Sequence, residues 1–108
     1  MNTAPALKQE KIDELTQRIV QAAHPRRIIL FGSAVRGKTT SDSDLDFFIV
    51  KEDVPHRGID RMRQVRDIIN TDMPCDFLVA KPSEVKKRLL LGDPFIKEIM
   101  EQGKVIYG

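Results

Sequence analysis

At residues 43–50 the chain reads SDLDFFIV, two acidic positions leading into an apolar run rich in aromatic and β-branched side chains. Such a run predicts a buried strand. Side chains two positions apart on a strand share a face, so Asp44 and Asp46 are expected to point the same way. A second run, CDFLV at residues 75–79, carries Asp76 near its start. A neighbouring strand would bring this third aspartate beside the first two.

Three crowded carboxylates favour a bound cation. They repel one another, and some would take up protons unless positive charge neutralised them. Hard divalent cations prefer oxygen ligands, and Mg²⁺ is usually held by a few carboxylates together with substrate phosphates. The pattern therefore indicates a metal-dependent enzyme that acts on a phosphate compound.

The overall composition fits one small globular domain. The 108 residues are 41% hydrophobic and 31% charged, which is ordinary for a soluble protein and predicts a single domain over 1–108 with a loose tail at 1–6. The net charge of +2 is too weak to indicate direct nucleic-acid binding. One cysteine excludes an internal disulfide, and no run approaches the ~20 apolar residues of a membrane span, so a cytoplasmic location is expected.

Periodicity and turn residues predict the order of elements. Helices are expected where apolar residues recur at helical spacing, and strands where short apolar runs are bounded by Gly, Pro or polar clusters. The predicted helices are 7–23, 57–70, 82–91 and 94–102, and the predicted strands are 27–31, 44–50, 76–80 and 104–107. This order indicates an α/β (α+β) fold, a small mixed sheet of about four strands with helices packed against it.

The loop between the first two strands contains a nucleotide-binding pattern. Residues 32–39 read GSAVRGKT and satisfy the P-loop consensus G-x-x-x-x-G-K-[ST]. A P-loop lysine, however, opens a long helix whose N-terminus faces the phosphates. Here a strand is expected from Asp44, which leaves too few residues for that helix. A P-loop nucleotide hydrolase is kept only as an alternative.

A calcium loop is a second alternative for the same region. Asp42, Asp44 and Asp46 have the 1, 3, 5 spacing of an EF-hand. Position six should be glycine and position twelve glutamate, but these positions hold Phe47 and Asp53. The spacing of the acids is therefore better explained by a strand.

A different pattern covers both the loop and the strand. Gly32-Ser33, ten further residues and then Asp44-Leu45-Asp46 resemble the signature of the DNA polymerase β-like nucleotidyltransferase superfamily. Within it, the chain looks most like the minimal nucleotidyltransferases (MNT), the antitoxins of MNT/HEPN toxin–antitoxin pairs. The resemblance extends from the leading helix to the closing GKVIY at 103–107, and it implies the polymerase β-like nucleotidyltransferase fold.

The resemblance implies a role for each motif residue. Gly32 would let the backbone approach a phosphate closely, and Ser33 would offer its hydroxyl and amide to a triphosphate. Asp44 and Asp46 would hold two Mg²⁺ ions. Asp76 would complete one metal site and help to deprotonate the attacking hydroxyl.

The rest of the loop matches the family pattern GSxARGxxRPxSD in part. Arg36 and Ser43 agree with it and are expected to contribute to nucleotide binding. Thr40 and Ser41 stand where the family commonly has arginine and proline. Lys38 would then supply positive charge to the triphosphate, as a point charge rather than a bidentate donor.

These features together predict a transferase. The resemblance implies that a nucleoside monophosphate, AMP from ATP, moves to a hydroxyl acceptor with release of pyrophosphate. Little of the chain is left over to bind an acceptor, so the acceptor is expected on another protein, a tyrosine of a HEPN-type toxin. An alternative is a non-catalytic antitoxin that neutralises its partner by binding. The sequence leaves open whether the assembly is a homo- or hetero-oligomer.

Four arginines surround the second predicted helix. They are Arg57, Arg61, Arg63 and Arg66. Charged residues distributed around a helix usually form a solvated face, and this is the expectation here. The alternative is a docking surface for an acidic partner.

Overall fold

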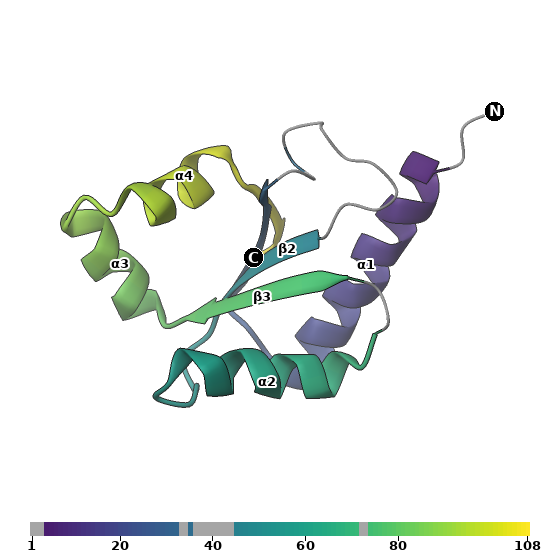
Figure 1. Cartoon of the computed structure of the whole chain (residues 1–108), viewed down its shortest axis with the longest axis horizontal. Coiled ribbons are helices and arrows are strands. Elements are labelled where there is room, and N and C mark those ends of the chain that lie inside the picture. Colours follow the sequence, from purple (N-terminus) through teal and green to yellow (C-terminus); the bar gives the residue numbers. More distant parts are fainter. Residues whose placement is uncertain (1–3, 33–34, 36–44, 72–73) are drawn as a thin grey trace.

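The computed structural model describes residues 4–32, 35, 45–71 and 74–108. Within these ranges, eight elements follow one another in the predicted order (Figure 1). They are α1 (Ala4–Ala23), β1 (Arg27–Phe31), β2 (Leu45–Val50), α2 (Gly58–Ile69), β3 (Cys75–Ala80), α3 (Pro82–Leu90), α4 (Pro94–Gln102) and β4 (Lys104–Tyr107).

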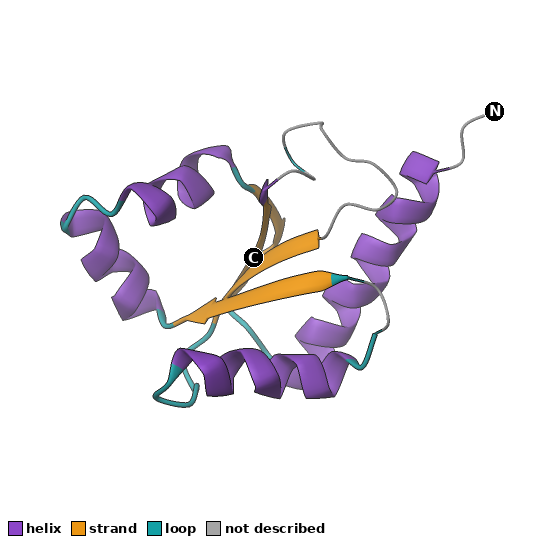
Figure 2. Ribbon diagram, in the orientation of Figure 1, coloured by secondary structure: helices purple, strands orange, loops and turns teal. Residues whose placement is uncertain are grey.

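The four strands form one mixed sheet in the order β3-β2-β1-β4 (Figure 2). Strand β1 lies antiparallel to both β2 and β4, whereas β2 and β3 are parallel. A parallel pair needs a crossover connection, and α2 provides it. The predicted mixed α/β sheet is confirmed.

Helices cover both faces of the sheet. Helices α1 and α2 pack on one face, over a core cluster that includes Leu45, Phe47 and Ile49 of β2. Helices α3 and α4 pack on the other face, where Phe48 and Val50 contact them. The two clusters draw on alternate residues of β2 because successive side chains of a strand point to opposite faces.

Helix α1 begins at Ala4, earlier than predicted. The expectation of a loose tail over 1–6 is therefore wrong for residues 4–6, while residues 1–3 lie outside the described part. Pro5 is compatible with this start because proline is tolerated in the first turn of a helix.

At the C-terminal end of α1, Ala23 is buried and Ala22 is exposed. Ala23 lies four residues after Ile19 and therefore continues the buried face of the helix.

The expectation of a solvated face on α2 is wrong for one arginine. The side chain of Arg61 is only 9% exposed. Its guanidinium donates to both carboxylate oxygens of Glu84, with N–O distances of 2.7 and 3.2 Å. It also donates to the carbonyls of Pro55, His56 and Val79. Arg61 thus joins α2, the end of β3 and the start of α3.

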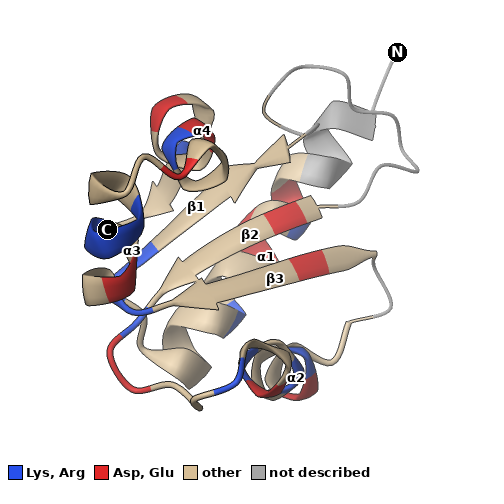
Figure 3. Cartoon of the chain, turned by 60° about the vertical axis from the view of Figure 1, so that its left-hand side comes forward, with Lys and Arg blue, Asp and Glu red and all other residues tan. Residues whose placement is uncertain are grey.

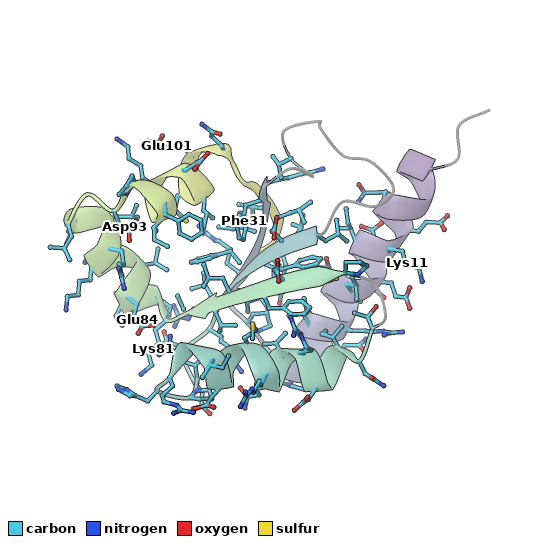
Figure 4. All side chains as sticks on the ribbon, in the orientation of Figure 1. Lys11, Phe31, Lys81, Glu84, Asp93 and Glu101 are labelled. Atoms are coloured by element: carbon cyan, nitrogen blue, oxygen red, sulfur yellow. The ribbon has the colours of Figure 1, made fainter. Side chains whose placement is uncertain are left out.

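Glu84 completes this connection from α3. Its Oε1 accepts a hydrogen bond from the backbone N–H of Lys81, 2.8 Å away, where β3 meets α3 (Figure 4). The hydrogen bond from the Arg61 guanidinium, together with that of Lys81, lowers the pKa of the Glu84 carboxyl. The pair therefore depends on an ionised Glu84.

Across the residues that the structure describes, no helix is long and apolar enough to cross a membrane.

Candidate active site

Two of the three predicted aspartates lie side by side on the sheet. Strands β2 and β3 pair in a register that sets Asp46 opposite Asp76, and the acidic segments of the two strands adjoin in Figure 3. Neighbouring strands lie about 4.8 Å apart. The expected proximity of Asp46 and Asp76 is confirmed. Asp44 precedes the described start of β2 and lies outside the described residues.

The alternation of each strand directs both carboxylates to the same face. Leu45 and Phe47, on either side of Asp46, are fully buried among α1 and α2. Asp46 must therefore point to the face covered by α3 and α4. Asp76 precedes the buried Phe77 and points the same way. Asp46 is half-buried and Asp76 is exposed, so this end of the sheet is open.

Gly32 brings the backbone against one of these carboxylates. It follows β1 with φ of +78°, a left-handed conformation that favours glycine. A β-carbon at this position would lie 2.3 Å from Oδ2 of Asp46. The carbonyl of Gly32 accepts a hydrogen bond from the N–H of Val35, 3.2 Å away. The turn therefore requires glycine both for its backbone conformation and for the room that Asp46 occupies.

A small pocket of about 240 Å³ opens beside Gly32 and Asp46. Helix α4 forms its opposite side with Phe95, Glu98 and Gln102. The rings of Phe31 and Phe95 meet edge to face, 6.0 Å between centroids at 82°, and the Phe31 label in Figure 4 marks this part of the sheet. The pocket thus combines apolar walls with polar side chains next to a carboxylate.

The remaining predicted nucleotide-binding residues lie outside the described residues. They are Ser33, Arg36, Lys38 and Ser43. Within the described ranges, no three His, Cys, Asp or Glu side chains are grouped so that they could hold a metal ion. Asp46 and Asp76 supply two adjacent carboxylates, a donor set that suits a hard cation such as Mg²⁺. The residues present therefore fit the predicted metal, and the ligand role of all three aspartates stays a prediction.

The contribution of α4 to this pocket was not predicted from the sequence. Phe95, Glu98 and Gln102 are spaced by three and four residues, so they share one face of the helix. That spacing was available in the sequence. Which face of α4 turns to the sheet depends on packing that the spacing alone does not give.

Comparison with known proteins identifies the family. The profile of the family described as "Polymerase beta, Nucleotidyltransferase" matches residues 10–108. The chain belongs to this nucleotidyltransferase family. The antiparallel pairing of β1 with β2 agrees with this assignment and gives no support to a P-loop.

A curated relative and a solved structure illustrate what the chain is similar to. "Putative protein adenylyltransferase MJ1305" of Methanocaldococcus jannaschii is 31% identical over 85 residues, which cover 74% of this chain. The chain spans 56% of the length of that relative. The crystal structure of a "putative nucleotidyltransferase" from Sulfolobus solfataricus superimposes with a TM-score of 0.65 at 20% identity, covering 97% of this chain and 87% of the other. The second likeness supports the fold.

Proposed function

We propose that this protein transfers a nucleoside monophosphate, AMP from ATP, to a hydroxyl group on an acceptor. The observation that carries the proposal is the pairing of Asp46 with Asp76 directly beside Gly32, in a chain of the nucleotidyltransferase family. The acceptor oxygen attacks the α-phosphorus, and the bond from that phosphorus to the bridging oxygen of the β-phosphate breaks. Pyrophosphate leaves with both electrons of that bond.

The described residues have distinct parts in this reaction. Gly32 has no side chain and so leaves room for the Asp46 carboxylate beside the turn, and its bare backbone is proposed to approach a phosphate closely. Asp76, the more exposed of the two acids, takes the proton of the acceptor hydroxyl and returns it to solvent. Asp46 lies on the phosphate side of the reacting atoms, next to Gly32. Ser33, Arg36, Lys38 and Ser43 are proposed to bind the triphosphate.

Magnesium is the proposed metal, held by Asp44, Asp46 and Asp76. When bound, two such ions neutralise the phosphate charge and polarise the attacking and leaving oxygens. Asp46 and Asp76 alone place two carboxylates within about one strand spacing, a pair of oxygen donors that suits a hard divalent cation. This crowding supports the metal assignment independently of the motif.

The proposed acceptor is a tyrosine of a HEPN-type toxin, and the chain acts as its antitoxin. The support is the resemblance of the Gly32-Ser33 and Asp44-x-Asp46 motifs to minimal nucleotidyltransferases. The name of the M. jannaschii relative, a protein adenylyltransferase, agrees with a protein acceptor.

The test is a labelling reaction with a candidate toxin, Mg²⁺ and α-labelled ATP. We expect label on the toxin with the wild-type chain and none with Asp46→Asn. Asp67→Asn, an exposed aspartate on α2, is the matched control and keeps the activity. Absence of label with ATP, GTP, CTP and UTP would reject the transfer. Neutralisation that Asp44→Asn and Asp46→Asn both leave intact would favour an antitoxin that acts by binding.

A further inference from the structure

A second and larger groove lies on the same face of the sheet as the two aspartates. Its volume is about 590 Å³. Strands β2 and β3 form the floor, and helices α3 and α4 form the walls. The apolar side chains that line it include Phe48, Leu78, Val85, Leu91, Phe95 and Ile96.

The groove is continuous with the candidate active site. On this face Asp46 is followed by Phe48, and Asp76 by Leu78, two positions further along each strand. Two residues of a strand span about 6.6 Å. Phe95 lines both the groove and the smaller pocket beside Gly32. A molecule seated in the groove would therefore lie next to the two carboxylates on the same face of the sheet.

Several apolar side chains of the groove are exposed. The exposed fractions are 38% for Leu78, 73% for Leu91 and 49% for Phe95. Contiguous exposed apolar surface beside a polar site is typical of a surface that binds a partner. Among the described side chains that line the groove, only Phe95 is both aromatic and exposed. Nucleic acids are usually held by several such rings, so the surface fits a polypeptide better.

The charges around the groove indicate which charge a partner should carry. The residues that line the groove include three basic side chains, Arg61, Lys87 and Arg88, and two acidic ones, Glu84 and Asp93. Both acids are engaged within the chain. Glu84 binds Arg61, and Asp93 accepts hydrogen bonds from the N–H groups of Phe95 and Ile96 and pairs with Arg88.

The groove therefore has one basic side chain in excess, that of Lys87. Lys87 and Arg88 line the groove from α3, which carries basic residues in its last turn and shows blue segments beside a red one in Figure 3. Complementary charge on a partner speeds association and disfavours partners of the same sign. The groove is therefore suited to a partner segment that carries both acidic and apolar side chains.

We propose that this groove docks the acceptor protein through a segment in which acidic and apolar residues flank the reacting hydroxyl. The inference rests on the proposed function and adds the chemistry of the partner's docking segment. Apolar side chains of the segment fill the space over Leu78 and between Leu91 and Phe95. Its acidic side chains meet Lys87, and its hydroxyl lies over Asp76.

Two blocked synthetic peptides provide the test. One has the sequence Glu-Leu-Tyr-Glu-Leu, and the other is its charge reversal, Lys-Leu-Tyr-Lys-Leu. Each is titrated into the ¹⁵N-labelled full chain, without nucleotide, and followed by amide chemical shifts. We expect the acidic peptide to shift the amides of residues 78, 85–91 and 95, and to bind at least tenfold more tightly than the basic peptide.

Adjacent residues of α3 and its C-cap give matched variants. Lys87→Glu and Leu91→Ala alter residues that line the groove, whereas Lys86→Glu and Leu90→Ala make the same changes at exposed positions outside it. The groove variants are expected to weaken binding of the acidic peptide at least fivefold more than their controls. All four positions are exposed, so the variants should fold.

Each other outcome overturns the docking proposal. It is wrong if the shifts map to the face formed by α1 and α2, if both peptides bind equally, or if a single-stranded oligonucleotide occupies the groove more tightly than the acidic peptide. It is also wrong if sedimentation shows a dimer that Leu91→Ala dissociates, since the occupant is then a second copy. Failure of the proposed function is separate: Mg²⁺ with ATP would then not raise the melting temperature, whatever the peptides do.

Discussion

Gly32 and Asp46 are so close that a β-carbon on the glycine would lie 2.3 Å from Oδ2 of the aspartate. The contact joins the turn after β1 to a proposed catalytic carboxylate on β2. We therefore expect Gly32→Ala to displace that carboxylate and to reduce nucleotide transfer by about 100-fold, the effect of a misplacement near 1 Å. Steady-state transfer of label from α-labelled ATP measures this loss.

Two other glycines separate the steric contact from backbone strain. Gly92 also has a positive φ, of +76°, but a β-carbon at this position would meet no atom within 4 Å. Gly58 has the same open space and no positive φ. Gly32→Ala and Gly92→Ala should each lower the free energy of unfolding by about 1–2 kcal/mol, while Gly58→Ala should not. Only Gly32→Ala should lose transfer. Full activity of Gly32→Ala would show that the contact with Asp46 is unimportant.

The neighbouring carboxylates of Asp46 and Asp76 should make the metal-free protein less stable. Like charges directly opposite on adjacent strands are destabilising. Asp46→Asn is therefore expected to raise the free energy of unfolding without metal by about 0.2–1 kcal/mol, the range for cross-strand pairs. Urea denaturation followed by circular dichroism measures the change.

Ligand binding provides the second measurement on the same variant. Mg²⁺ with ATP should raise the melting temperature of the wild type, because only the folded state assembles the site. The rise should disappear in Asp46→Asn and persist in Asp67→Asn. A less stable, metal-free Asp46→Asn would instead indicate that this carboxylate supports the fold.

Arg61 is expected to be the most important charged residue for stability. Arg61→Ala removes its bonds to Glu84 and to three backbone carbonyls, and should lower the free energy of unfolding by about 2–4 kcal/mol. Arg61→Lys should be intermediate because an ammonium cannot reproduce the bidentate geometry. The exposed Arg63→Ala is the control, with a change within about 0.5 kcal/mol. Equal effects of the two alanine variants would refute this role.

Glu84 should make stability depend on pH in the acidic range. Its pKa is lower in the folded protein than its ordinary value of 4.5. The unfolded state therefore binds more protons, so the free energy of unfolding decreases as the pH is lowered. The stabilisation is present above about pH 4.5 and is lost as pH falls through the lower folded pKa.

The comparison with Glu84→Gln isolates this dependence. The urea midpoint of the wild type should exceed that of Glu84→Gln at pH 6–7, and the two should converge toward pH 3. Glu101→Gln, exposed on α4, should follow the wild type throughout. A constant difference between wild type and Glu84→Gln would contradict the pKa argument.

Most of the fold was predictable because short-range patterns and packing agree. Helix α4 is an example, since Asp93-Pro94 predicts its start and Gly103 its end, and both bounds are observed. Strand β2 is another, since its apolar run admits no other element. Arg61 was not predicted, although it lies four residues before Val65 and eight before Ile69, on the same buried stripe. Only the approach of α3 gives that position a carboxylate partner.

The candidate site was predictable in part. The period of two on β2 and β3 gives the face of Asp46 and Asp76, but their register comes from the pairing of strands thirty residues apart in sequence. The groove between α3 and α4 follows from how these two short helices cover the sheet. The exposure of Leu91 and Phe95 is a tertiary property that local sequence does not specify.

The parallel pairing of β2 with β3 has a consequence for folding kinetics. The two strands meet only after the α2 crossover has docked, a long-range event of the kind that slows folding. We expect the carboxylates of Asp46 and Asp76 to come together late, after the transition state. Relief of their repulsion should then slow unfolding and leave the folding rate unchanged, so cation binding would extend the lifetime of the native state.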